Sequence, residues 1–343
     1  MMNKIMDTNT ESSAFKHAVF SSSNDNYFRS RRKFLSKLKP EAQMMLMDKS
    51  FQQEAGKPTV NREVYTAGHK KKQPGTLLRS EGGKPVEDKD VNHVYDAAGY
   101  TWDFYNTIFS RNSIDNKGLK LIQTVHYDSK YNNAFWDGQQ MVYGDGDGKI
   151  FGSFTSDIDI IGHELTHGIV QYECNLAYKD QSGALNESLA DIFGIMIKQK
   201  TLNQDVTQSN WLIGENVLNG KDYALRSLKA PGTAYVNHPE MGTDPQPNDM
   251  SGYVNDPFDS GGVHYNSSIP NHAFYVAAFN TGGYAWEKIG RIWYAAMCDK
   301  ALVSETCDFA FFKAATLFYA AKLFPGDTAV LKNVQAGWQT VGL

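Results

Sequence analysis

From about residue 77 to residue 156, the pattern of hydrophobic and polar positions mainly predicts β-strands. Residues 119–127 and 140–143 alternate apolar and polar positions, the period-two pattern of a half-buried strand. Residues 92–109 instead repeat aromatic and apolar residues at helical spacing and predict an amphipathic helix. The glycine- and aspartate-rich residues 144–148 predict a tightly turned loop.

Helical spacing dominates from residue 157 onwards. Ser156 or Asp157 can cap a helix that runs to about Val170, and a second helix is predicted at 186–198. Residues 232–262 are rich in Pro, Gly, Asn and Asp, and loops of this length usually carry function. The remaining predicted helices are 271–280, 284–301, 307–323 and 328–341.

Length and charge exclude several classes of protein. The 343 residues suggest two domains, and 34 basic against 38 acidic residues give a net charge of −4, too near neutral to indicate a nucleic-acid partner. No apolar run reaches the ~18 residues that a membrane span needs. The N-terminal residues show no apolar secretory signal, and none of the 3 cysteines forms a C-x-x-C pair.

The first 54 residues differ from the rest. They contain no glycine, and their nine basic and six acidic residues give +3, whereas the remainder carries −7. A basic leader can dock on an acidic body through its charge. A solvated tail is the alternative, and composition alone leaves both open.

One motif carries chemistry. Residues 163–167 read His-Glu-Leu-Thr-His, an H-E-x-x-H sequence inside the predicted helix 157–170. Residues of a helix turn by ~100° each, so histidines four positions apart lie about 40° apart on one face. His163 and His167 can therefore converge on one Zn²⁺, with Glu164 beside the position of a water molecule. Two packed or surface histidines are the alternative.

The next predicted helix supplies a third candidate ligand. Glu187 and Asp191 are four positions apart on one face and stand among apolar residues. Apolar neighbours imply partial burial, which a carboxylate tolerates when it is paired or ligating. Glu187 would complete a His₂Glu set with one position open for water, and Asp191 would accept the distal N–H of His163. A solvated acidic face is the alternative.

These motifs resemble the thermolysin family of zinc metalloendopeptidases, both in the spacing from His167 to Glu187 and in GALNESLADIFG at residues 183–194. The resemblance covers about residues 77–343. The short leader and the lack of a visible signal make the chain most similar to the protealysin-like branch. Further matching segments are NNAFW at 132–136, GDGDG at 144–148, ALRS at 224–227, DSGGVH at 259–264 and the closing residues 338–342.

The resemblance implies an α+β, two-domain gluzincin fold. A β-rich N-terminal domain, a central zinc-binding helix and a mainly α-helical C-terminal domain would flank a cleft. The expected division is a propeptide at 1–54, an N-terminal catalytic domain at 55–177 that includes the zinc helix 157–170, and a C-terminal helical domain at 178–343. The implied protein is a monomeric, neutral zinc endopeptidase that acts on peptides and proteins.

The resemblance also assigns catalytic roles. Glu164 matches the base that takes a proton from water and delivers it to the leaving amine. His264 and Tyr178 match positions that donate hydrogen bonds to the oxyanion, and Asp259 matches the carboxylate that orients His264. Without the family match, His264 would be interpreted as a structural histidine and Tyr178 as a packed aromatic residue.

Substrate contacts follow from the same matches. Arg226 matches the arginine that holds a substrate carbonyl, and Asn133 and the Ala134 carbonyl match groups that pair with an extended peptide. The residues that match the family's S1′ pocket are apolar. Each one could equally belong to the hydrophobic core, but together they imply cleavage on the amino side of bulky hydrophobic residues. The apolar residues that match the S1′ pocket are Phe151, Phe154, Ile160, Ile213, Val217 and Leu225.

The calcium ligands depart from the family pattern. Asp159 and Glu215 match two acids of the family's double-calcium site, but Lys198, Asn210 and Leu212 stand where the family has carboxylates. An ammonium group cannot ligate Ca²⁺, although it can replace the charge. We therefore expect one catalytic Zn²⁺ and loss of the double-calcium site, with other calcium positions left open.

The leader departs too. Protealysin-like propeptides carry a proline-containing motif near the start, and here only Lys39-Pro40 is present. The resemblance of the sequence that follows nevertheless points to a junction near Glu54-Ala55. It implies a propeptide that the enzyme removes from itself. Without a visible signal, the protein is expected outside the cell by a non-standard route or in the cytoplasm. Cys298 and Cys307 could pair after export.

Three rival interpretations are weaker. Aminopeptidases of the same H-E-x-x-H layout typically have one residue fewer between the two motifs and a G-x-M-E-N motif, which is absent here. An inert binding module usually lacks the general base or a ligand, whereas all of these residues are present. A structural zinc site is disfavoured because three protein ligands leave an open position.

Overall fold

The computed structural model describes residues 58–343, so the predicted propeptide of residues 1–54 and its junction lie outside the described residues. The described chain divides into two compact units. The first, the sheet unit, ends at Tyr172 and also includes residues 216–221. The second, the helical unit, consists of residues 173–215 and 222–343. The division expected from the sequence lies five residues further along, after residue 177.

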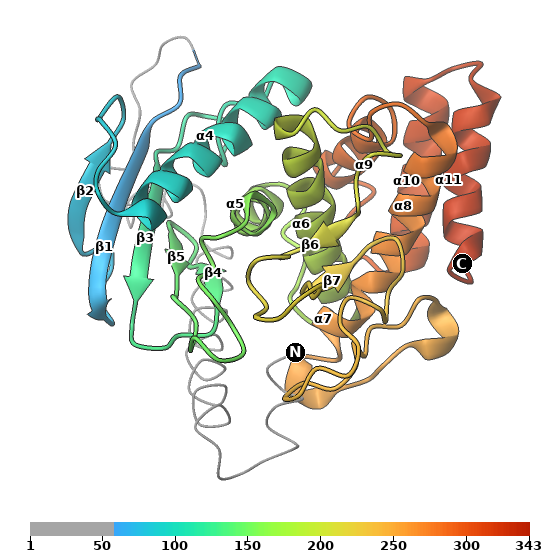
Figure 1. Cartoon of the computed structure of the whole chain (residues 1–343). Helices are drawn as coiled ribbons and strands as arrows, with labels where there is room; N and C mark the ends of the chain where they lie inside the picture. The colour runs from blue at the N-terminus through green and yellow to red at the C-terminus, as the bar shows by residue number, and fades with distance from the viewer. Residues whose placement is uncertain (1–57) are drawn as a thin grey trace. The chain divides into compact units, whose positions relative to one another are not determined.

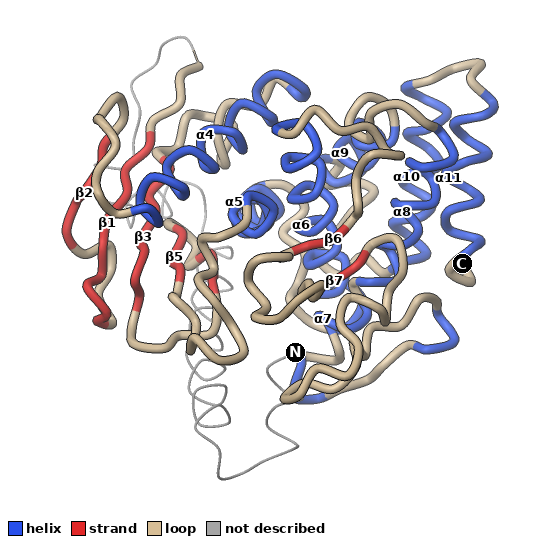
Figure 2. Tube along the Cα trace, viewed as in Figure 1, coloured by secondary structure: helices blue, strands red, loops and turns tan. Residues whose placement is uncertain are grey.

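A five-stranded mixed sheet forms the framework of the sheet unit, in the order β2-β1-β3-β5-β4 (Figure 2). The pairs β1–β2 and β4–β5 are antiparallel, whereas β1–β3 and β3–β5 are parallel. This order leaves β4 at one edge of the sheet. The strands are β1 (Arg62–Lys70), β2 (Thr76–Ser80), β3 (Leu121–Tyr127), β4 (Ala134–Trp136) and β5 (Met141–Tyr143).

Two helices, α4 (Lys89–Phe109) and α5 (Ile158–Tyr172), complete the sheet unit, and α4 packs against β1, β3 and α5 (Figure 1). Asp88 caps α4, because its Oδ1 accepts hydrogen bonds from the backbone N–H groups of Asp90 and Val91 at 3.0 and 3.3 Å. These amides would otherwise lack a partner in the first turn. The helix therefore begins at a position that its sequence specifies.

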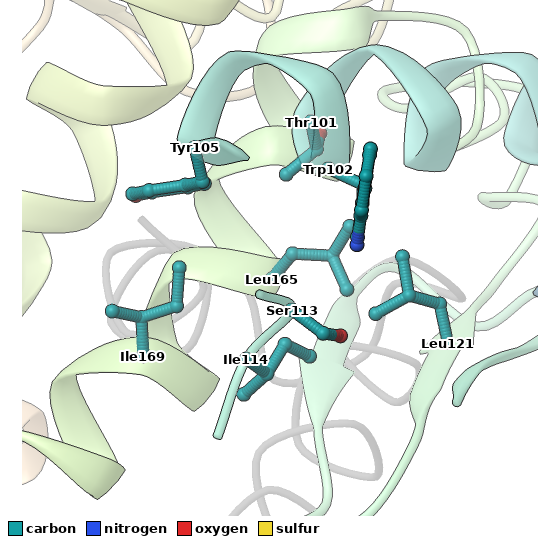
Figure 3. Close-up of a pocket in the computed structure, with 8 residues that line it drawn as sticks. All are labelled: Thr101, Trp102, Tyr105, Ser113, Ile114, Leu121, Leu165 and Ile169. Atoms are coloured by element: carbon teal, nitrogen blue, oxygen red, sulfur yellow. The ribbon is translucent and has the colours of Figure 1, made fainter. Parts of the chain in front are cut away.

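Helix α5 is buried along most of its length, and its packing fixes how it is turned. Leu165 and Ile169 line a small pocket together with Ile114 and with Tyr105 of α4 (Figure 3). The hydroxyl groups of Tyr105 and Thr166 are hydrogen-bonded at 2.8 Å. At ~100° per residue, Leu165 and Ile169 project away from the face that carries residues 163 and 167. Packing on the apolar side of α5 thus fixes the direction in which its polar side faces.

The helical unit is arranged around α6, which packs against α7, α8 and α10, while α8 packs along α11. The rings of Trp293 and Trp338 stack with centroids 6.0 Å apart and planes inclined by 3°. Within residues 58–343, no helix has both the length and the apolar character that crossing a membrane requires. The helices are α6 (Asp180–Thr201), α7 (Val263–Asn266), α8 (Ser268–Thr281), α9 (Ile289–Cys298), α10 (Phe309–Leu323) and α11 (Thr328–Thr340).

Short elements connect these helices. Strands β6 (Leu212–Ile213) and β7 (Arg226–Ser227) pair antiparallel. The loop at 232–262 contains two 3₁₀ turns, Met250–Gly252 and Pro257–Asp259, and a bridge between His238 and Gly242.

The α+β class predicted from the sequence is confirmed, and one difference concerns the start of α6. The predicted helix 186–198 begins six residues earlier, at Asp180. The residue before it, Lys179, makes no capping hydrogen bond through its side chain. Since sequence analysis places helix starts by capping side chains, this start carried no signal.

Candidate active site

The two histidines of α5 aim at a common position. The Nε2 atoms of His163 and His167 lie 3.0 Å apart, and their ring centroids lie 4.6 Å apart in an edge-to-face arrangement. Both side chains are buried. Two imidazole nitrogens that converge in this way are a donor set that suits Zn²⁺. The geometry of α5 therefore fits the zinc that the motif predicts.

Glu164 lies beside these histidines and faces β5. The pKa of Tyr143 is raised well above its ordinary value, first by burial and second by the negative charge of Glu164. The Tyr143 hydroxyl donates a 2.7 Å hydrogen bond to Oε1 of Gln123. Tyr143 therefore stays neutral beside the Glu164 carboxylate.

The edge strand β4 is held by the glycine-rich loop that follows β5. The backbone N–H of Gly144 donates to the carbonyl of Asn133 at 3.0 Å, and Ala134 pairs with Tyr143. Asp147 fixes the same loop, since its Oδ1 accepts the backbone N–H groups of Lys149 and Ile150, both at 2.8 Å. The predicted peptide-binding residues thus lie on a well-anchored sheet edge.

In the helical unit, a series of hydrogen bonds connects four of the predicted site residues. Nδ1 of His264 lies 2.5 Å from Oδ1 of Asp259, and Nε2 of His264 lies 3.0 Å from the Tyr178 hydroxyl. The Tyr178 hydroxyl also donates to Oε1 of Glu187. The backbone N–H of His264 donates to Oδ2 of Asp259 at 2.8 Å. The structure therefore places Tyr178 and His264 next to Glu187.

The charge of Asp259 is maintained although the residue is buried. Burial by itself raises the pKa of this carboxyl, but the charge and hydrogen bonds of His264 outweigh it, so the pKa of Asp259 lies below its ordinary value. The backbone passes close to Val254 at the residue before α7. Gly262 has φ +84°, and a Cβ there would lie 2.5 Å from the Val254 carbonyl oxygen.

Asp191 and Arg226 form a two-point ion pair. Nε and one Nη of Arg226 donate to the two carboxylate oxygens of the fully buried Asp191 at 2.8 and 2.7 Å. Nδ2 of Asn271 donates to the same carboxylate at 2.9 Å. The arginine predicted to hold substrate is thus itself held in place by Asp191.

Three supporting residues were not predicted. Asn271 contacts Asp191, and Nε2 of Gln246 donates to the His264 carbonyl at 2.6 Å. The pKa of the buried Asp244 carboxyl is raised, mainly by burial, although Arg226 opposes the shift. Gln246 and Asp244 both lie in the loop 232–262, whose composition marked it as functional. Asn271 stands at the start of a predicted helix, and its partner is not visible from the sequence.

The predicted S1′ residues are all buried and fall into two groups. In the sheet unit, residues 216–221 join the loop after β5: Gly152 N–H donates to the Val217 carbonyl at 2.8 Å, and the rings of Phe151 and Phe154 lie 5.7 Å apart. Ile160 belongs to α5 of the same unit. In the helical unit, Leu225 N–H donates to the Ile213 carbonyl at 2.8 Å.

A lysine and two neighbours surround Glu215. Nζ of Lys198 lies 2.7 Å from Oε2 of Glu215 and 3.2 Å from the Leu212 carbonyl, and Asn210 donates to Oε1 of Glu215 at 2.7 Å. Burial would raise the pKa of Glu215, but the hydrogen bonds of Lys198 and Asn210 lower it below its ordinary value. The ammonium group is thus paired with one of the acids that match the family's double-calcium site.

The cysteines are present as free thiols. Cys174, Cys298 and Cys307 form no disulfide within the described residues. Burial raises the pKa of Cys307 to about 12 and that of Cys174 further still. Buried, protonated thiols are poor nucleophiles, so Cys174 and Cys307 fill a structural role.

Comparison with known proteins extends over nearly the whole chain. A family model described as the thermolysin metallopeptidase catalytic domain matches residues 24–171. A second, described as the thermolysin metallopeptidase alpha-helical domain, matches residues 174–343. The two matches meet close to the point where the two compact units divide.

Individual relatives are similar over most of their length. An extracellular metalloprotease of Pectobacterium carotovorum subsp. carotovorum is 50 % identical over 285 residues, which cover 82 % of this chain and 81 % of that protein. Protease PrtS of Photorhabdus sp. (strain Az29) is 46 % identical over 289 residues, covering 83 % and 77 %. The solved precursor of protealysin, a metalloproteinase from Serratia proteamaculans, superposes with TM-score 0.80 at 44 % identity, covering 92 % of this chain and 97 % of that one.

The Lys198–Glu215 pair generates a stability prediction. Lys198→Met keeps the aliphatic stem and removes the charge, so we expect a loss of about 1 kcal/mol at pH 7, measured by urea unfolding. Because the pKa of Glu215 is depressed on folding, the pair stabilises the protein above the unfolded value of 4.5 and loses its effect as the pH falls below that value.

The control is Lys179→Met, which removes an exposed lysine 3.5 Å from Asp180. It should change stability by no more than about 0.5 kcal/mol at either pH. A Lys198→Met deficit that stays constant down to pH 3.5 would argue against the ion pair.

Proposed function

Since the chain belongs to the thermolysin family of metallopeptidases and is a zinc-dependent endopeptidase, we propose how its own residues carry out peptide-bond hydrolysis. His163, His167 and Glu187 hold the zinc ion. Zinc supplies Lewis acidity, which lowers the pKa of water and polarises a carbonyl group. The observation that carries this proposal is the convergence of the two Nε2 atoms on α5, 3.0 Å apart.

Glu164 is the general base. It follows His163 directly, so it lies at the height where the two imidazoles converge, and its carboxylate faces a neutral Tyr143. It takes a proton from the attacking water and delivers it to the leaving amine. One carboxylate can serve both steps, because the base that accepts the proton becomes the acid that returns it.

His264 and Tyr178 stabilise the oxyanion. The Tyr178 hydroxyl and Nε2 of His264 lie 3.0 Å apart, close enough for both to reach one oxygen. Donors held next to a developing negative charge stabilise it. Asp259 positions His264 through two hydrogen bonds, to Nδ1 and to the backbone N–H.

The substrate binds as an extended strand along β4. Asn133 and the Ala134 carbonyl pair with its backbone, as the edge position of β4 in the sheet allows. Arg226 is held by Asp191 and donates to a substrate carbonyl. Phe151, Phe154, Ile160, Ile213, Val217 and Leu225 form an apolar S1′ pocket, which favours bulky hydrophobic residues on the carboxyl side of the cut.

The chain is made as a zymogen that processes itself and acts outside the cell. Residues 1–54 form the propeptide, followed by catalytic domains at 55–177 and 178–343, and the mature enzyme is a monomer. The net charge of +3 on the leader against −7 on the remainder supports docking of the leader on the body. The similarity to a protealysin precursor and to an extracellular metalloprotease supports the same proposal.

The double-calcium site is lost and replaced by Lys198. Its ammonium group lies 2.7 Å from Glu215, so a tethered cation neutralises one acid that matches that site.

Glu164→Ala tests the mechanism and the processing together. We expect kcat/KM on casein-derived peptides to fall about 10²–10⁴-fold while the zinc content is kept. Wild-type protein should shorten to a form that begins near residue 55, and the variant should stay full length, as read by N-terminal sequencing over time.

Glu87→Ala, at an exposed glutamate, is the control and should behave like wild type. Activity that survives 1,10-phenanthroline would overturn the zinc mechanism. If wild type and Glu164→Ala both remain full length, the first 54 residues are a tail.

The S1′ assignment predicts the cleavage preference. In a library of blocked peptides, Leu and Phe should dominate the position after the scissile bond, because an apolar pocket leaves a charged side chain without a partner. The readout is kcat/KM at each residue of that position. A preference for charged residues at that position would contradict the S1′ assignment.

Loss of the double-calcium site predicts stability that is independent of calcium. In calcium-free buffer that contains zinc, adding millimolar CaCl₂ should leave the melting temperature unchanged. A rise of about ten degrees would contradict the proposal, since a ligand that binds the folded state raises Tm by mass action.

A further inference from the structure

The sheet unit holds a second group of metal-ligating side chains that shares no residue with the proposed catalytic site. His69, His126 and Asp145 each offer one ligand atom, and these atoms lie within 4.8 Å of one another. We propose that these three residues bind a divalent transition-metal ion, Zn²⁺, at a second site. Two imidazoles and one carboxylate form a donor set that zinc favours, with the remaining position left to water.

The carboxylate of Asp145 stands between the two rings. Its Oδ1 lies 2.8 Å from Nδ1 of His126, and its Oδ2 lies 3.1 Å from Nδ1 of His69. The ring centroids of the two histidines lie 5.4 Å apart. The two Nδ1 atoms therefore face one carboxylate from both sides, and small side-chain rotations admit an ion among the three donors.

Asp88 holds His126 in the orientation that ligation needs. Its Oδ2 lies 2.9 Å from Nε2 of His126, while its Oδ1 caps helix α4. A metal-bound imidazole usually donates its other ring N–H to a carboxylate, which fixes the tautomer and raises the basicity of the ligand. His126 has this arrangement already, with Nδ1 as the atom that would bind the ion.

The backbone is irregular where the two histidines lie. In the β1–β3 pair, Thr66 pairs with Val125 and Lys70 with Tyr127, so β1 has residues 67–69 where β3 has only His126. His69 and His126 both adopt the left-handed conformation, with φ of +59° and +54°. Such a conformation costs free energy for a residue other than glycine, and bulges of this kind re-aim side chains. This irregularity is independent of the side-chain distances and turns both rings toward Asp145.

The ion has to displace a proton. The titratable groups that face His126 are Asp145 after β5, Asp88 and Asp90 at the start of α4, and His69 at the end of β1. Hydrogen bonding to Asp145 raises the pKa of His126 to about 9; burial opposes this shift, and the charge of Asp145 and the contact with Asp88 add to it. The Nδ1 proton would leave when the ion binds, because a metal-bound imidazole nitrogen carries no proton.

Access to the site is open on one side. The His69 side chain is 62 % exposed, whereas those of His126 and Asp145 are 17 % and 27 % exposed. An ion that enters from solvent would join the end of β1 to the loop after β5. That loop also holds Asn133 through Gly144, so the ion would stabilise the sheet edge.

The test counts zinc on the full chain. Holoenzyme is dialysed to equilibrium against a series of buffered Zn²⁺ concentrations at pH 8, and zinc per chain is measured by mass spectrometry. Wild type should take up a second zinc ion, and its melting temperature should rise with that uptake. His69→Ala and Asp145→Asn should weaken the second binding event by at least about tenfold. His69→Ala should keep wild-type peptidase activity, since His69 belongs neither to the proposed catalytic site nor to the loop that anchors β4.

His93→Ala is the matched control, because it removes another histidine of the sheet unit that lies outside the cluster. It should bind the second zinc as wild type does. A wild-type chain that holds only one zinc up to 100-fold excess would overturn the proposal. A second zinc bound equally well by His69→Ala would also overturn it. Both readouts are zinc counts, so they stand apart from any failure of the catalytic assignments.

Discussion

The proposed zinc site depends on how helix α5 is turned about its own axis. A rotation by one residue, ~100°, would carry both imidazoles away from their common position. Packing prevents that rotation: the Tyr105 and Thr166 hydroxyls are hydrogen-bonded at 2.8 Å, and a Cβ at Gly168 would lie 2.8 Å from Ile114 Cγ2. The chemistry on one face of α5 is therefore set by ordinary side-chain packing on the others.

Each of two buried acids of the proposed site is paired with a partner side chain, and the pairing also fixes the position of that partner. Asp191 is fully buried and receives two hydrogen bonds from Arg226. Asp259 is buried and lies against His264. A lone charge in such surroundings would be very costly, so each acid requires hydrogen-bond donors close to it. The requirement fixes the arginine and the histidine as firmly as it stabilises the acids.

The sequence predicted what short-range spacing determines and missed what the fold brings together. His163 and His167 could be placed because helical geometry relates positions four residues apart. The thermolysin family followed from the motifs, and the α+β class followed from the resemblance to that family. The cluster of His69, His126 and Asp145 had no such signal. Its members come from three separate segments, and left-handed histidines are not encoded by any local pattern.

The path of the chain between the two units has a consequence for how the protein forms during synthesis. The chain leaves the sheet unit after Tyr172, returns to it for residues 216–221 and leaves again. This returning segment supplies the carbonyl that accepts Gly152 N–H and the backbone N–H of Asn216, which Asp157 accepts at 2.7 Å. The sheet unit therefore cannot be completed until the ribosome has passed residue 221, by which time the whole of α6 has been made. Although it comes first in the chain, the sheet unit does not finish folding as an independent N-terminal module, and the maturation of the two units is linked through the covalent chain.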